Sequence, residues 1–244
     1  RWRWAGLAAA SALLLSSCSA MKLAYNRLDW VVSWEVGKYL DLEGPSKPLF
    51  DEGFASLWQW HRSTQITAYA RELREIGEAQ GAPTREQIAG YWQRASAHGE
   101  RLFLEALPPS ARVLQALDDE QVRGLLEKMS EDRREEAEED LERSPEKTRE
   151  QYARNSSRTL RRWLGSLSDA QRALVRDWAG TRRDDPALWQ RYGEQWAAAF
   201  ERTLASRASP GFEARLRDVF RDPQLPDSAA IRDLNGYNRE HYID

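Results

Sequence analysis

The residues best suited to binding chemistry lie close together in one stretch of the chain: Trp58, Trp60, His61, Arg62 and Tyr69. Residues three positions apart are neighbours on a helix, so His61 is expected beside Trp58. An aromatic floor with polar groups above it could hold a glycan or a peptide. The competing interpretation is a partly buried histidine that is hydrogen-bonded at a break in the helix. We keep these five residues as a candidate ligand-binding cluster.

The remaining sequence offers little for catalysis. The three histidines, His61, His98 and His241, form no His-x-x-x-His pair, and with one cysteine in the chain no zinc-ligand spacing arises. Neither a Gly-x-Ser-x-Gly elbow nor a phosphate-binding glycine loop occurs. The acidic residues lie mostly on charged faces, where the pairing of two carboxylates is incidental. We therefore expect no catalytic residue, no metal, no cofactor and a non-enzymatic protein.

Cys18, the only cysteine, stands where a lipid could be attached. Arg1 and Arg3 precede an apolar, small-residue run that ends at Leu15-Ser16-Ser17-Cys18. This pattern is typical of a secretory signal, and the run is shorter than the roughly 20 residues that span a membrane. The sequence Leu-Ser-Ser-Cys resembles the lipobox of bacterial lipoproteins, whose cysteine sulfur receives a diacylglycerol before cleavage. The resemblance implies a signal peptide over 1–17 and an anchor at Cys18.

The lipobox resemblance also implies an address in the cell envelope. In such lipoproteins a serine directly after the cysteine, here Ser19, usually permits transfer to the outer membrane. We expect a chain held at the periplasmic face of the outer membrane, with the inner membrane as the alternative. Several acyl chains, such as palmitate, on one cysteine make a stable anchor where a single chain is marginal.

Composition describes a water-soluble part after Cys18. Charged residues make up 31% of the 244 residues, the formal net charge is −3 and the mean hydropathy is −0.75. This balance gives no argument for a nucleic-acid partner. Eleven tryptophans are spread along the chain, which favours helix packing over a single aromatic site. We expect one domain over 18–244; its oligomeric state and the role of 226–244 stay open.

Apolar residues recur at spacings of three and four and predict an all-α fold of about eight helices in an irregular bundle. The first helix follows the anchor, from Leu23 to Leu40. A second runs from Phe50 to Ile76, with a break near Ser63-Thr64. Five later helix starts carry a capping residue with either a glutamine three positions on or a proline directly after it. These starts are Thr84–Gln87, Asp118–Gln121, Ser144-Pro145, Ser168–Gln171 and Asp185-Pro186.

The segment 118–165 loses its apolar stripe in the middle. From Ser130 to Glu150 only Ala137 and Leu141 are apolar, and the remainder is dominated by charged residues. A helix without an apolar face has nothing to bury. We therefore expect a long helical hairpin near 118–165 whose tip projects into solvent, with the arm 131–151 as a docking surface for an envelope protein.

Two short resemblances extend this interpretation. Leu117-Asp118-Asp119-Glu120-Gln121 and Leu167-Ser168-Asp169-Ala170-Gln171 resemble the Leu-Thr-x-x-Gln signature of all-helical periplasmic chaperones, although helix capping alone also explains both. More widely, Trp60-His61-Arg62-x-Thr64, Tyr69 and Cys18-Ser19 are similar to features of an uncharacterised all-helical family of Gram-negative lipoproteins, domain of unknown function 6279. That resemblance implies the address and the fold but no activity.

Three functions remain as hypotheses. The leading one is a membrane-anchored envelope lipoprotein that binds or adapts a protein partner through the arm 131–151. The second is a chaperone-like periplasmic holdase. The third is a binder or enzyme for cell-wall or lipid material that acts through the Trp60-His61-Arg62 region.

Overall fold

The computed structural model describes residues 28–221 and 223–243, and these are helical with connecting turns and loops. The all-α fold and the expected number of about eight helices are confirmed. Helices α3 and α4 are joined by the π-helical turn η1, so the three form one continuous element. The helices are α2 (Leu28–Val36), α3 (Ser46–Trp60), η1 (His61–Gln65), α4 (Ile66–Glu78), α5 (Arg85–Gln115), α6 (Asp119–Glu142), α7 (Pro145–Leu164), α8 (Asp169–Thr181), α9 (Pro186–Ala205), α10 (Phe212–Arg221) and α11 (Ser228–Ile243).

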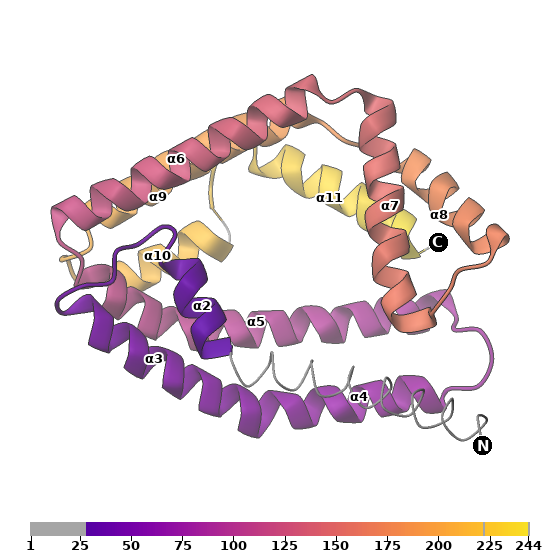
Figure 1. Ribbon diagram of the computed structural model, residues 1–244, viewed down its shortest axis with the longest axis horizontal. Coiled ribbons are helices and arrows are strands. Elements are labelled where there is room, and N and C mark those ends of the chain that lie inside the picture. Colours follow the sequence, from indigo (N-terminus) through magenta and orange to yellow (C-terminus); the bar gives the residue numbers. More distant parts are fainter. Residues whose placement is uncertain (1–27, 222, 244) are drawn as a thin grey trace, which may run out of the picture.

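The helices are arranged as the sides of a frame (Figure 1). The element α3–η1–α4 lies along α5 on one side, α6 lies along α9 on the second, and α7 lies along α8 on the third. Helix α11 contacts α5, α8 and α9 and so connects the sides. Gly44 and Gly81 lie in the connections before α3 and α5 with φ values of 54° and 80°, which other residues rarely adopt.

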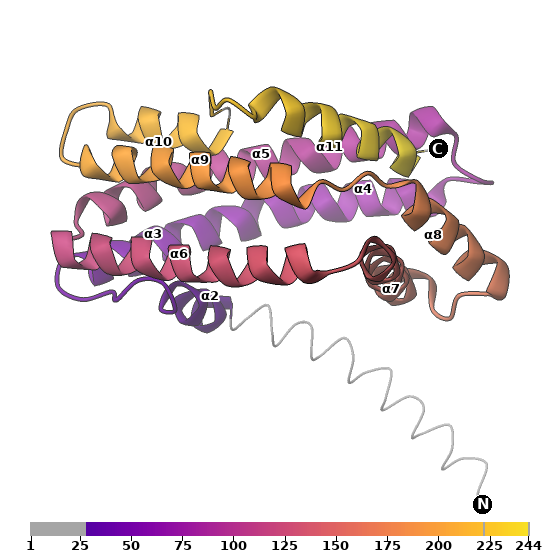
Figure 2. The same ribbon diagram turned by 90° about the horizontal axis from the view of Figure 1, so that it is seen from above.

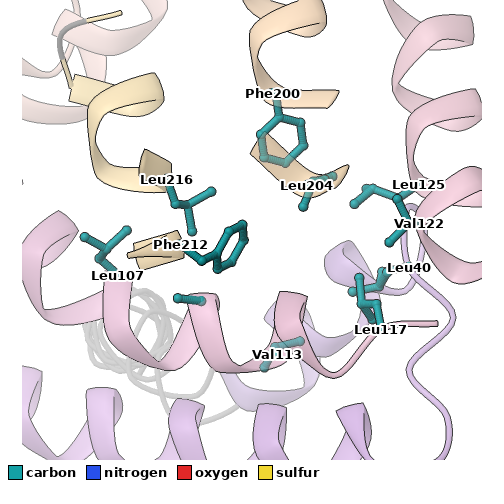
Figure 3. Packing of buried hydrophobic residues seen from close by; sticks show 11 residues of the cluster. Leu40, Leu107, Val113, Leu117, Val122, Leu125, Phe200, Leu204, Phe212 and Leu216 are labelled. Atoms are coloured by element: carbon teal, nitrogen blue, oxygen red, sulfur yellow. The ribbon is translucent and has the colours of Figure 1, made fainter. Parts of the chain in front are cut away.

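The largest group of buried apolar side chains lies at one end of the frame, where α5, α6, α9 and α10 meet (Figure 3). Leu204 is fully buried, and Phe212 and Leu216 are 1% exposed. Leu40, from the segment that follows α2, also joins this group and ties the N-terminal helix to it. The buried cluster consists of Leu40, Leu107, Ala111, Val113, Leu117, Val122, Leu125, Phe200, Leu204, Phe212 and Leu216.

The contact between α3 and α5 depends on one glycine. A Cβ atom added to the buried Gly53 would lie 2.7 Å from the Cβ of Pro109. Pro109 is inside α5, and its ring is part of the backbone. Gly53 therefore lets the two helices approach more closely than any other residue would allow.

All five helix starts expected from capping signals are confirmed. Thr84, Asp118 and Ser168 form complete capping boxes, in which the cap side chain accepts from the backbone of the glutamine and that glutamine's side chain accepts from the cap. Ser144 Oγ accepts from Lys147 N at 3.3 Å, and Asp185 Oδ1 accepts from Leu188 N at 2.9 Å.

The projecting hairpin expected over 118–165 is wrong. Helices α6 and α7 exist and are separated at Ser144, but they diverge there instead of packing against each other (Figure 1). Helix α6 follows α9, and α7 follows α8. The physical reason is a stripe of half-buried residues on α6 that hydropathy does not identify, because small side chains and aliphatic stems also cover a neighbour. This stripe consists of Ser130, Arg133, Ala137 and Asp140.

Candidate functional site: a charged groove at the helical corner

The five residues predicted as a ligand-binding cluster lie at and beside the π-turn η1. Trp58 and His61 stack at 5.8 Å between ring centroids with an interplanar angle of 8°, and Trp60 is tilted against His61 at 6.5 Å. Tyr69 meets His61 edge-on at 5.7 Å. Burial lowers the pKa of His61, which favours the neutral ring at pH 7. Arg62 is exposed on the same turn.

The π-turn directs Gln65 toward α5, where it meets a histidine that sequence reasoning did not connect to the cluster. His98 is 8% exposed; its Nδ1 lies 3.1 Å from Gln65 Oε1 and its Nε2 lies 2.9 Å from Glu72 Oε1. Gln65 is itself only 5% exposed, and Tyr69 packs edge-on against His98 at 4.7 Å. No local spacing could have found this pairing, since 33 residues separate His98 from Gln65.

These contacts favour a structural role for the cluster. The rings of Trp58, His61, Tyr69 and His98 follow one another in a continuous row of contacts that joins the π-turn to α5. None of the three cavities described below is lined by any of the five predicted residues. The break expected near Ser63-Thr64 takes the form of the π-turn η1 within a continuous helix, and the hydrogen-bonded buried histidine beside it is His98.

A groove of about 660 Å³ lies at the corner where α6 and α7 meet α9. We call it the corner groove. Trp189 and Tyr152 supply aromatic surface to it, and Trp189 is 39% exposed. The charged residues that line it are of both signs: Arg133, Arg134, Arg143, Glu136, Asp140, Asp184 and Glu194.

Part of the charge in the corner groove is already paired. Arg143 Nη1 donates to Asp140 Oδ1 at 2.6 Å, which holds the end of α6 at the corner. Asp184, in contrast, lies near another negative charge: burial and the carboxylate of Asp140 raise the pKa of Asp184. Arg134 is exposed and forms no ion pair with another described residue. A bound segment with charges of its own would thus find at least one available cation in the groove, Arg134.

The wall of the corner groove that precedes α9 is fixed by α11. Asn238 Oδ1 accepts from Arg183 N and Asn238 Nδ2 donates to Arg183 O, both at 2.9 Å. The Arg183 guanidinium also lies 3.6 Å from the centre of the Tyr237 ring. Asn238 is 8% exposed, so water does not compete well for these bonds. The loop between α8 and α9 is held in one geometry before any partner binds.

The opposite flank of α7 borders a second groove, of about 650 Å³, that runs along α8. Its lining is basic, because five arginines face only two glutamates. Arg149 and Arg154 are paired with those glutamates, Glu146 and Glu150, at 3.3 and 3.2 Å. Helix α7 therefore separates a groove of mixed charge from a basic one.

A third cavity, of about 400 Å³, is almost wholly apolar and is bordered by α2, α3 and α5. Within the described residues, no group of three or more His, Cys, Asp and Glu side chains is arranged to hold a metal ion. None of the described helices is long and apolar enough to cross a membrane. Cys18 and the signal segment expected over 1–17 lie outside the described residues.

Comparison with known proteins identifies the family of this chain. The curated proteins and the solved structures contain no match to this chain. A family of unknown function, DUF6279, matches residues 38–228, a range that includes the π-turn, the corner groove and the basic groove and excludes α2. Since this match covers more than half of the sequence, the chain belongs to the family of unknown function DUF6279.

Proposed function

We propose that this protein is a non-enzymatic binding module, anchored in the cell envelope through a lipid on Cys18, which holds a segment of a partner protein in the corner groove. The observation that carries the proposal is the groove itself. It combines exposed aromatic surface with charges of both signs over a volume in the range of ligand sites. Such a lining suits a polypeptide, which offers apolar side chains and charges together.

The arm 131–151, predicted as a docking surface, contributes much of this groove. Arg133, Arg134 and Glu136 line it from α6, and Thr148 and Gln151 line it from α7. The arm is packed rather than free, because α6 lies along α9 and α7 lies along α8. Deleting 131–151 would therefore damage the fold, and point substitutions on the groove are the proper test.

The holdase alternative loses the motif that suggested it. The glutamines of both pentads, Gln121 and Gln171, are used in capping boxes, and Gln121 Nε2 also donates to Asp41 O at 2.7 Å. These side chains stabilise helix starts, which is the ordinary task of that sequence pattern.

The test is photo-crosslinking in cells from a reactive residue placed at Gln190, which is exposed and lines the groove. The perturbing variant is Arg134→Glu. The matched control is Arg158→Glu, an equal charge reversal at an exposed position on α7 that lines neither α7 groove. We expect one discrete crosslinked band that weakens about tenfold in Arg134→Glu, equivalent to about 1.4 kcal/mol, and is unchanged in Arg158→Glu.

Each other outcome contradicts the proposal in its own way. A band that survives Arg134→Glu but not Arg158→Glu would place the partner on another surface. A smear of many crosslinked proteins would favour the holdase. The absence of any crosslink would direct attention to small ligands and the Trp60-His61-Arg62 region. A band that persists in a Cys18→Ser form would remove the need for the anchor.

A further inference from the structure

Helix α2 is apolar on two opposite sides. Its inner side, with Val32 and Val36, borders the apolar cavity next to α3 and α5, and Val36 packs against the buried cluster. Its outer side carries Trp30, Val31 and Trp34, which are 64%, 39% and 54% exposed. An apolar face of a helix is normally covered by a neighbour. Among the residues that the structure describes, none covers the outer side of α2.

The two tryptophans present a single surface. Trp30 and Trp34 are one helical turn apart, and their rings stack at 6.4 Å with an interplanar angle of 12°. The ammonium group of Lys38 lies 3.8 Å from the centre of the Trp34 ring and 2.7 Å from Glu35 Oε2. Paired indole rings flanked by a lysine match the composition of protein segments at the boundary between lipid tails and water, where Trp and snorkelling Lys are enriched.

We propose that the outer face of α2, formed by Trp30, Val31 and Trp34, docks onto the surface of the lipid bilayer together with Lys38 from the turn that follows the helix. The tryptophans insert at the level of the headgroups, and Lys38 remains among the phosphates. This inference rests on the anchor at Cys18 that is part of the proposed function, and it adds a second membrane contact to the lipid.

The placement of α2 in the fold favours the bilayer over other occupants. Trp30 follows Cys18 by 12 residues, which span at most about 40 Å, so an anchored chain keeps α2 near the membrane. Helix α2 also lies outside α3 and α6 on its side of the molecule, where neither helix stands between it and a flat surface (Figure 2). A bilayer can cover the face without a cavity of complementary shape, and two exposed rings alone form too small a patch for a stable protein interface.

The experiment places an environment-sensitive fluorophore on Val31→Cys in the full chain, isolated with its native anchor and reconstituted in vesicles of phosphatidylethanolamine and phosphatidylglycerol. Val31 lies between the tryptophans, so both stay in place. Leu174→Cys, at a 67% exposed position on α8, is the control. We expect the label at 31 to shift its emission to the blue, to be quenched by spin-labelled lipid and to lose quenching by aqueous iodide. The label at 174 should show the reverse.

The same label is then read in a Trp30→Ser/Trp34→Ser background, whose folding is checked by circular dichroism. We expect iodide quenching at 31 to rise to the level seen at 174. Iodide quenching at 31 that already equals that at 174 in the native background would overturn the proposal, and this reading needs no variant that could unfold. If protection of the label at 31 from iodide disappears when the protein is diluted in lipid, a second copy of the chain covers α2, and the proposal would also be overturned.

A failure of membrane docking by α2 can be distinguished from a failure of partner binding in the corner groove. Trp30→Ser/Trp34→Ser should keep the crosslink from Gln190, whereas Arg134→Glu should lose that crosslink and keep the shielding at 31. The anchor has its own control, because native protein with an acylated Cys18 has no thiol to label. Labelling of Cys18 would refute the anchor and, with it, the docking of α2.

Discussion

Gly53→Ala tests the packing on which the α3–α5 side of the frame depends. The added methyl group would lie 2.7 Å from the Cβ of Pro109, closer than such atoms come in practice, with the Pro109 Cα and Cγ at 3.7 and 3.9 Å. A proline ring inside a helix cannot turn aside as a flexible side chain does. The two helices must therefore separate, and relief of the clash requires a shift of the backbone.

The expected magnitude follows from two opposing effects. Overpacking of a close contact costs about 1–3 kcal/mol. Alanine is the better helix former by about 1 kcal/mol, which offsets part of that cost. Gly53→Ala should therefore lower the free energy of unfolding by up to about 2 kcal/mol. Gly99→Ala, on an exposed face of α5 with nothing within 4 Å of the added atom, should instead raise it by up to about 1 kcal/mol.

Urea denaturation followed by far-UV circular dichroism measures both variants. For a domain of this size each kcal/mol corresponds to about 2–4 °C in Tm, so thermal melting gives a second reading. If Gly53→Ala proved as stable as Gly99→Ala, the close approach of α3 and α5 would not exist in solution, and the reasoning from packing would be refuted.

Three further substitutions test other parts of the structure by the same unfolding measurements. His98→Leu leaves the buried amide oxygen of Gln65 without its partner and should cost about 1–3 kcal/mol, whereas an unchanged stability would show that the pairing is absent. Arg207 donates from Nε to Leu117 O at 3.1 Å with a side chain only 15% exposed, and Arg207→Lys, which lacks the planar fork, should cost about 1–2 kcal/mol. Asp184 has a raised pKa in the folded protein, so its ionisation lowers the free energy of unfolding as pH rises through that pKa. Asp184→Asn should raise the free energy of unfolding at pH 7 and not at pH 3, which lies below the ordinary pKa of Asp, about 4; an equal effect at both pH values would argue against the pKa shift.

The sequence predicted the local structure well because the signals involved are local. A capping box needs only residues three positions apart, and Thr84, Asp118 and Ser168 form theirs as expected. The break near Ser63 likewise coincides with η1, where Ser63 and Thr64 both donate to Trp60 O. Side chains that bond to the preceding turn compete with the helical ladder, and that competition can be recognised in the sequence.

The candidate site was predicted in part. The arm 131–151 was identified from its charge, and it does line the corner groove. The opposite wall of the groove was missed. Its residues Asp184 and Trp189 come from the α8–α9 loop and from α9, which no local pattern connects to the arm. In the cluster around His61, the rings of Trp58, His61 and Tyr69 lie together and form a row of contacts that continues to His98. Ligand binding by this cluster stays a prediction.

The sequence by itself therefore determined the helices and their starts, since each depends on contacts within a few residues. Only the tertiary structure decided which helices pair. Helix α6 packs along α9, and on α6 Ser130, Ala137 and Arg133 are half-buried. Gly193 on α9 leaves room for the aliphatic stem of Arg133, since a Cβ added at Gly193 would lie 3.9 Å from Arg133 Cδ. Such packing depends on the complementary shapes of residues that are far apart in the sequence, and hydropathy carries no information about those shapes. This pairing places α6, α7 and α9 around the corner groove.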